Sequence, residues 1–220
     1  MKRKTKLVLD AFMVLSLPAL MAYALLGDYF HELLGTATSI VFAVHHYLNR
    51  GWHKSFFKGK QNAWRIVQTT LNVALFALMI IQPISGILTS KRLFAFLPAL
   101  SLSAKARSAH LVCSYWFYVL ASAHAGTRLN LRAAKSRRAK IARALAAVLV
   151  AGVSVYGGYA FVKRGFFGYM TGKTLFAFFN YNEPEAAFFA DYLSVMILFA
   201  TIGLLARTFL KKSASTRYKS

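Results

Sequence analysis

The chain has 220 residues, of which 57% are hydrophobic and 15% are charged. Its mean hydropathy of +0.46 is too high for a soluble domain of ordinary composition. The formal net charge of +22 could indicate a nucleic-acid-binding protein, but the basic residues cluster between long apolar runs. Runs of about 20 apolar residues are long enough to cross a lipid bilayer. We therefore expect a membrane protein that does not bind nucleic acid.

Six apolar runs predict an all-α fold, an integral membrane bundle of six transmembrane helices. The expected spans are 7–26, 31–49, 65–89, 108–127, 142–162 and 189–209. The first could instead be a cleavable signal peptide, because basic residues precede it and Ala22-Tyr23-Ala24 resembles a cleavage site. Its apolar run is longer than the usual signal core, which favours a retained helix.

The basic residues predict how these spans are oriented. Of the 28 lysines and arginines, 21 lie before the first span, in the second-to-third and fourth-to-fifth connectors, or after the sixth span. The opposite side has the other seven, together with five of the six acidic residues. Lysine and arginine are enriched on the cytoplasmic side of membrane proteins. We therefore expect a multi-pass protein of the cytoplasmic membrane with both termini in the cytoplasm.

Four of the six histidines form two pairs with the same spacing. His31 and His45 are fourteen residues apart, and so are His110 and His124. Fourteen residues make about four helical turns, so the two histidines of a pair share nearly the same face, about 21 Å apart along the axis. Such residues are costly inside a membrane helix and are usually functional there.

The second and fourth spans carry these pairs and should run parallel, because one span separates them. His31 then lies opposite His110 near the outer side, and His45 lies opposite His124 near the inner side. This arrangement predicts two bis-histidine haems stacked across the membrane. The chain has one cysteine and no Cys-x-x-Cys-His motif, so we expect haem b held without a covalent bond.

His46 is the main alternative to His45 as the inner ligand. Measured from His31, it lies about 60° round the helix, and His45 about 40° in the other direction, at about 100° per residue. The angles barely separate the two residues. The fourteen-residue spacing favours His45.

A porphyrin can lie against a helix only where nearby side chains are small. Gly35 and Gly86 are expected to provide such space. Haem propionates need cations at the membrane edge, and Arg107 is the expected partner at the outer site. Further candidates are Lys105 for the outer propionates, Arg50 and Arg128 for the inner ones, and Gln68, Asn72 and Gln82 for a quinone.

These elements resemble the flavinylation-associated cytochrome family of bacterial membrane b-type cytochromes. The resemblance covers about residues 7–127. Its elements, in order, are His31-Glu32-Leu33-Leu34-Gly35, His45-His46-Tyr47-Leu48-Asn49-Arg50-Gly51-Trp52, Ser85-Gly86-Ile87, His110 with Tyr115-Trp116, and His124-Ala125-Gly126. In the family's His-x-x-x-Asn element the ligand precedes the asparagine by four residues, which falls on His45.

The resemblance implies two b haems that carry electrons across a bacterial cytoplasmic membrane to an extracytosolic flavoprotein with covalently bound FMN. The expected donor is a quinol, menaquinol or ubiquinol, or a donor on the cytoplasmic side, although the direction could equally be reversed. The chain would be an electron-transfer protein or the membrane subunit of an oxidoreductase rather than a stand-alone enzyme.

The expected domains are a four-helix dihaem core at 1–130 and a two-helix C-terminal membrane extension at 131–220. The extension contains an aromatic outer segment, 163–188, which is either a lid or docking surface or an aromatic belt at the lipid headgroups.

Two other functions are compatible with intramembrane histidines. One is a divalent-metal transporter or channel, but zinc sites combine histidines with carboxylates, and the nearest acids are Asp28 and Glu32. The other is a membrane anchor with structural histidines, in which apolar replacements would leave function intact.

Overall fold

The computed structural model describes residues 2–52, 62–97, 103–129 and 136–216. All regular structure in these ranges is α-helical, so the predicted all-α fold is confirmed. The helices are α1 (Lys2–Met21), α2 (Tyr23–Leu48), α4 (Ala63–Thr89), α5 (Ser103–Arg128), α6 (Arg137–Lys163), α7 (Phe166–Met170) and α8 (Glu185–Thr216). Most of the two basic connectors, at 53–61 and 130–135, lies outside the described residues.

Each predicted span coincides with a long helix, apart from a break in the first. The expected span 7–26 crosses the end of α1 at Met21, and α2 begins at Tyr23 after one buried residue, Ala22. Gly27 then has a positive φ of 81°, which glycine adopts without strain. Hydropathy does not reveal this break, because apolar residues continue through it.

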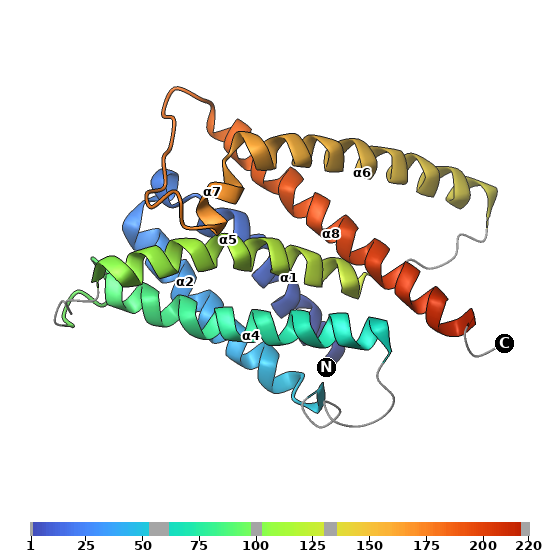
Figure 1. Cartoon of the computed structure of the whole chain (residues 1–220), viewed down its shortest axis with the longest axis horizontal. Coiled ribbons are helices and arrows are strands. Elements are labelled where there is room, and N and C mark those ends of the chain that lie inside the picture. The colour runs from blue at the N-terminus through green and yellow to red at the C-terminus, as the bar shows by residue number, and fades with distance from the viewer. Residues whose placement is uncertain (1, 53–61, 98–102, 130–135, 217–220) are drawn as a thin grey trace.

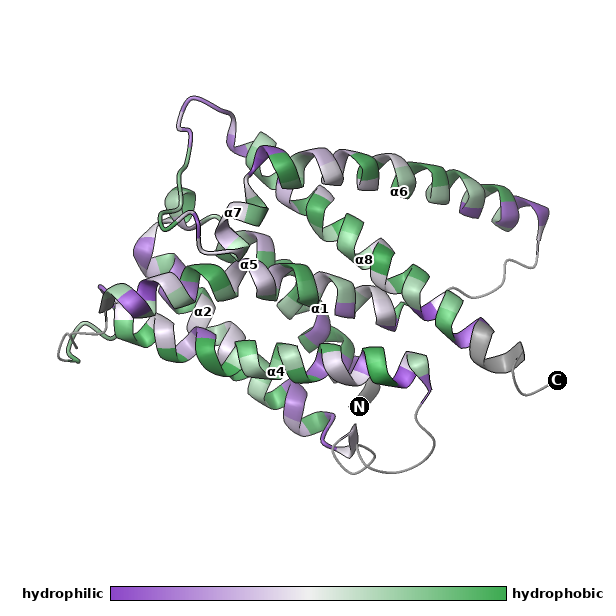
Figure 2. Ribbon diagram, viewed as in Figure 1, coloured by the Kyte–Doolittle hydropathy of each residue, from purple (hydrophilic) through white to green (hydrophobic). Residues whose placement is uncertain are grey.

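Among the described helices, α4, α6 and α8 are long and apolar enough to cross a membrane, which is compatible with a membrane protein. Figure 2 shows hydrophobic residues along the helices and hydrophilic residues concentrated towards several helix ends. That α1, α2 and α5 cross the membrane as well stays a prediction.

Helix α5 occupies the centre of the bundle. It packs against α4 and α8, and α8 in turn packs against α6 (Figure 1). Helices α1 and α2 form an antiparallel hairpin, and α2 also contacts α4. Helix α2 does not pack closely against α5. The two helices that carry the paired histidines are therefore held apart.

The helix ends that carry the basic clusters lie towards the same end of the bundle, at the right in Figure 1. They are the start of α1, the end of α2, the start of α4, the end of α5, the start of α6 and the end of α8. We call this the basic end. The ends of α1, α4 and α6 and the starts of α2, α5 and α8 lie towards the opposite end.

Three glycines allow α8 to cross its neighbours at backbone contact. A Cβ atom at Gly126 of α5 would overlap the carbonyl oxygen of Ala200, and one at Gly203 would overlap that of Ala123. Small residues permit such close helix crossings in membranes. Gly126, two residues after His124, serves the contact between α5 and α8.

The third glycine, Gly157 of α6, predicts a position-specific loss of stability. A Cβ atom there would overlap the carbonyl oxygen of Ser194, whereas nothing lies within 4 Å of one at the adjacent Gly158. Gly157→Ala should destabilise the protein by about 1–3 kcal/mol through overpacking. Gly158→Ala should stabilise it by about 0.5–1 kcal/mol through helix propensity. Thermal unfolding in detergent checks this, and equal effects of the two variants would contradict the crossing.

The expected aromatic segment 163–188 is divided between the core and the surface. Its first part forms α7, whose Phe166 and Tyr169 are buried against the tyrosines of α5 and α8. Phe176, Phe178 and Tyr181 are exposed. The sequence could not separate the two groups, because a core aromatic and an aromatic at the headgroup level have the same composition.

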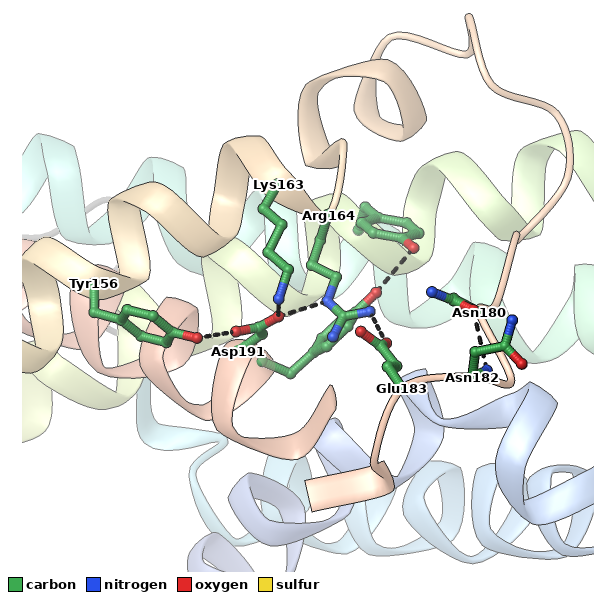
Figure 3. A network of polar contacts seen from close by, with 9 residues as sticks. Tyr156, Lys163, Arg164, Asn180, Asn182, Glu183 and Asp191 are labelled. Carbon is green, nitrogen blue, oxygen red and sulfur yellow. Dashed lines mark hydrogen bonds and ion pairs between the residues drawn. The ribbon is translucent and has the colours of Figure 1, made fainter. Parts of the chain in front are cut away.

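A buried ionic network joins α6 and α8 at the opposite end. Asp191 is fully buried, and its carboxylate accepts hydrogen bonds from Tyr156 Oη (2.5 Å), Lys163 Nζ (2.8 Å) and Arg164 Nε (2.8 Å) (Figure 3). Arg164 also pairs with Glu183 in the segment before α8. The network ties the end of α6 to the start of α8, and the sequence analysis did not identify it.

Candidate functional site

His31 of α2 and His110 of α5 lie next to each other. Their ring centres are 6.0 Å apart, and the ring planes are inclined at 74°. His31 Nδ1 is 3.0 Å from the Leu20 carbonyl oxygen, and His110 Nδ1 is 3.2 Å from that of Gln82. A carbonyl oxygen only accepts hydrogen bonds, so in both rings Nδ1 carries the proton. The lone pair of each neutral ring is therefore on Nε2, the nitrogen available to a metal.

The surrounding helices explain how these two rings are held. Leu20 is in the last turn of α1, where carbonyl groups lack partners within their own helix. Ser85 Oγ lies 3.1 Å from His110 Nδ1. A Cβ atom at Gly86 would be only 3.4 Å from His110 Cε1. The glycine thus lets the His110 ring lie close to the backbone of α4.

His45 and His124, the second predicted pair, both lie towards the basic end. His45 Nδ1 is 2.7 Å from Asp10 Oδ1 of α1, and its backbone carbonyl accepts a hydrogen bond from Asn49 Nδ2 (2.8 Å). His124 lies within electrostatic range of His45 and Arg128. Its Nδ1 is buried without a hydrogen-bond partner among the described residues. A buried polar atom without a partner is rare and needs an explanation.

His46 lies in a different environment from His45. Its ring stacks on those of Phe42 (5.8 Å between centres) and Phe76 of α4 (4.7 Å). The structure thus gives His45 a carboxylate partner and His46 two aromatic neighbours.

The remaining predicted site residues have less specific surroundings. The atom nearest to a Cβ placed at Gly35 would be Leu20 Cδ2, at 3.8 Å, so the space there borders α1. Arg107 is exposed on α5, three residues before His110. Thr38 lies midway between the two histidines of α2, and its buried hydroxyl has no partner among the described residues. The roles of Gly35 and Arg107 stay predictions.

The quinone candidates lie on α4. Asn72 Oδ1 is buried without a partner among the described residues, whereas the Gln82 side chain lies against His110. Gln68 is partly buried. These positions do not by themselves define a quinone pocket.

Glu32, next to His31, has a structural role at the end of the bundle opposite the basic end. Its carboxylate accepts hydrogen bonds from Ser90 Oγ (2.7 Å) and from the backbone N–H groups of Lys91 (2.8 Å) and Leu93 (2.6 Å). It thereby holds the segment after α4 against α2. Because of these contacts, Glu32 is not poised to complete a metal site with His31.

Lys91 in this segment has a second anchor. Its ammonium group lies 3.2 Å from Tyr23 Oη and 3.5 Å from Asp28 Oδ2. The contact with Tyr23, followed by the attraction of Asp28, raises the pKa of Lys91. Among the described residues, no three His, Cys, Asp or Glu side chains converge as they would around a metal ion held by protein alone.

Comparisons with known proteins add no relative: no family model, no curated protein and no solved structure matches the chain. The resemblance to the flavinylation-associated cytochromes thus stays a prediction.

Proposed function

We propose that this protein is a dihaem b-type cytochrome of a bacterial cytoplasmic membrane, related to the flavinylation-associated cytochromes. All six long helices cross the membrane, and the basic end faces the cytoplasm. His31 and His110 hold the outer haem, and His45 and His124 hold the inner one. The protein passes electrons between a quinol or a cytoplasmic-side donor and an extracytosolic flavoprotein with covalent FMN.

The geometry of the His31–His110 pair carries this proposal. Two neighbouring neutral imidazoles from different helices would be able to hold one metal ion between them. The ring centres of His31 and His110 are 6.0 Å apart. Metal-binding histidines usually donate the other ring N–H to a carbonyl or carboxylate. His31 and His110 make such contacts with carbonyl oxygens, and His45 does so with Asp10.

The packing of the helices that carry the histidines also supports the proposal. Helices α2 and α5 are held apart, whereas α5 packs closely on α4 and α8. The buried Nδ1 of His124 has no protein partner among the described residues; an ordered water at Nδ1 would supply one and leave Nε2 available to the iron. When bound, haem would supply one-electron redox chemistry at two depths, about 21 Å apart along the helices.

The chain's own contribution is to hold and orient the axial imidazoles. Helix α1 and helix α4 fix the rings of His31, His45 and His110 through the contacts at Nδ1. The divalent-metal alternative has less support, because zinc sites favour carboxylates beside histidine and Glu32 is engaged by the segment after α4.

A reduced-minus-oxidised visible spectrum of the purified protein tests the proposal. We expect sharp b-type bands and, by pyridine haemochrome analysis, close to two haems per chain. Protein expressed with adequate haem supply that contains no haem would contradict the proposal. Metal analysis would then test the divalent-metal alternative.

A further inference from the structure

Asp10 differs in position from the other acidic residues of the chain. Five of the six acidic residues belong to the segments expected on the outer side, and Asp10 is the sixth. It lies on α1 towards the basic end, with its Oδ1 2.7 Å from His45 Nδ1. An acid in such basic surroundings that contacts a candidate ligand calls for a specific explanation.

The register of the α1–α2 hairpin fixes this contact. One turn before Asp10, Lys6 Nζ donates hydrogen bonds to the Leu48 carbonyl and to Asn49 Oδ1, both at 2.9 Å. Near the other end of the hairpin, the Leu20 carbonyl meets His31. The contact between Asp10 and His45 lies between these two points. It therefore belongs to a pairing along the whole hairpin rather than to a chance approach of two flexible side chains.

The four candidate ligands differ in what holds Nδ1. His31 and His110 have neutral backbone carbonyls, His45 has a carboxylate, and His124 has no partner among the described residues. A hydrogen bond to an ionised acceptor is roughly twice as strong as one between neutral groups. Outer-shell partners of this kind raise the basicity of the ligating nitrogen. A more basic axial imidazole favours ferric over ferrous iron.

We propose that Asp10 is a positioning residue that fixes the orientation of His45 and lowers the reduction potential of the inner haem. This inference rests on the proposed dihaem function. The carboxylate acts through His45 and does not touch the iron. Two cations lie near Asp10. Lys6 is one turn earlier on the same helix, and Arg128 on α5 lies within electrostatic range of Asp10. These cations screen the carboxylate but do not replace its hydrogen bond.

Asp10→Asn is the sharpest variant, because the amide oxygen can still accept from Nδ1 while the charge is lost. An optical redox titration of the purified protein should resolve two haem components. In the variant we expect the reduction potential of the inner haem to rise by about 59 mV. For a one-electron couple, this is a tenfold change in the equilibrium constant between ferric and ferrous iron. The outer component should not move, and Asp10→Glu should restore the original potential.

Two controls make the result decisive. His124→Leu identifies the inner component as the one that it removes, and Glu185→Gln deletes an exposed acid at the first position of α8. Two haems with unchanged potentials in Asp10→Asn would overturn this inference and leave the proposed function intact. Absence of haem from the unaltered protein would overturn the proposed function itself. Loss of the inner haem alone in Asp10→Asn, with recovery in Asp10→Glu, would support the positioning role.

Discussion

Replacement of His110 by leucine is expected to halve the haem content, from two haems per chain to one. In the proposed dihaem arrangement, the leucine would remove one of the two imidazoles that hold the outer iron, and His31 alone would not replace it. The inner pair lies fourteen residues along each helix and keeps both of its ligands. Pyridine haemochrome analysis of the purified variant measures the loss directly.

Two matched variants test the pairing behind this expectation. His31→Leu should remove the same spectral component as His110→Leu, because both residues serve the outer site. His46→Leu should keep both haems, because its ring stacks on Phe42 and Phe76 instead of approaching Asp10. If His110→Leu keeps its full haem content, or if His46→Leu loses a haem, the proposed pairing of the histidines is wrong.

Asp191→Ala is expected to give the largest loss of folding stability. The fully buried carboxylate accepts hydrogen bonds from Tyr156, Lys163 and Arg164, so its removal leaves two cations without their shared partner. Breaking a buried ion pair by removing one partner costs about 3–5 kcal/mol. Because the Lys163 side chain is 36% exposed and Arg164 keeps Glu183, we expect the lower end of this range. Thermal unfolding in detergent should show a much lower midpoint.

The control for this variant lies six residues earlier on the same helix. Glu185 is exposed at the first position of α8, so Glu185→Ala should change stability by no more than about 0.5 kcal/mol. Because Asp191 belongs to the contact between α6 and α8, Asp191→Ala should keep two haems in the fraction that remains folded. Similar unfolding midpoints for the two variants would contradict the role given to the Asp191 network.

The sequence was sufficient for the helices and for the histidine pairs along them. Apolar run lengths mark helices, and a fourteen-residue spacing depends only on the period of one helix. The partner of His45 could not be found in this way. Asp10 is 35 residues away, and helical periodicity shows which residues share a face but not which residue of another helix comes opposite.

The same limit applies to the Asp191 network and to the break at Ala22. Lys163 and Arg164 read as ordinary flanking charges, since their partner belongs to another helix. The break between α1 and α2 interrupts no apolar run, so hydropathy does not reveal it. Because of this break, the Leu20 carbonyl has no partner within α1 and contacts His31 Nδ1 instead. This contact exists only in the folded hairpin.

The α1–α2 hairpin also bears on the order in which the protein is assembled. The groups that hold the rings of His31 and His45 all lie within the first 45 residues of the chain. Chains generally fold from the N-terminus as they are synthesised. Both imidazoles of α2 can therefore be oriented before the ribosome has made α5. In the proposed dihaem arrangement, the later arrival of His110 and His124 would complete both haem sites, so the capture of haem would wait for synthesis of the fourth long helix.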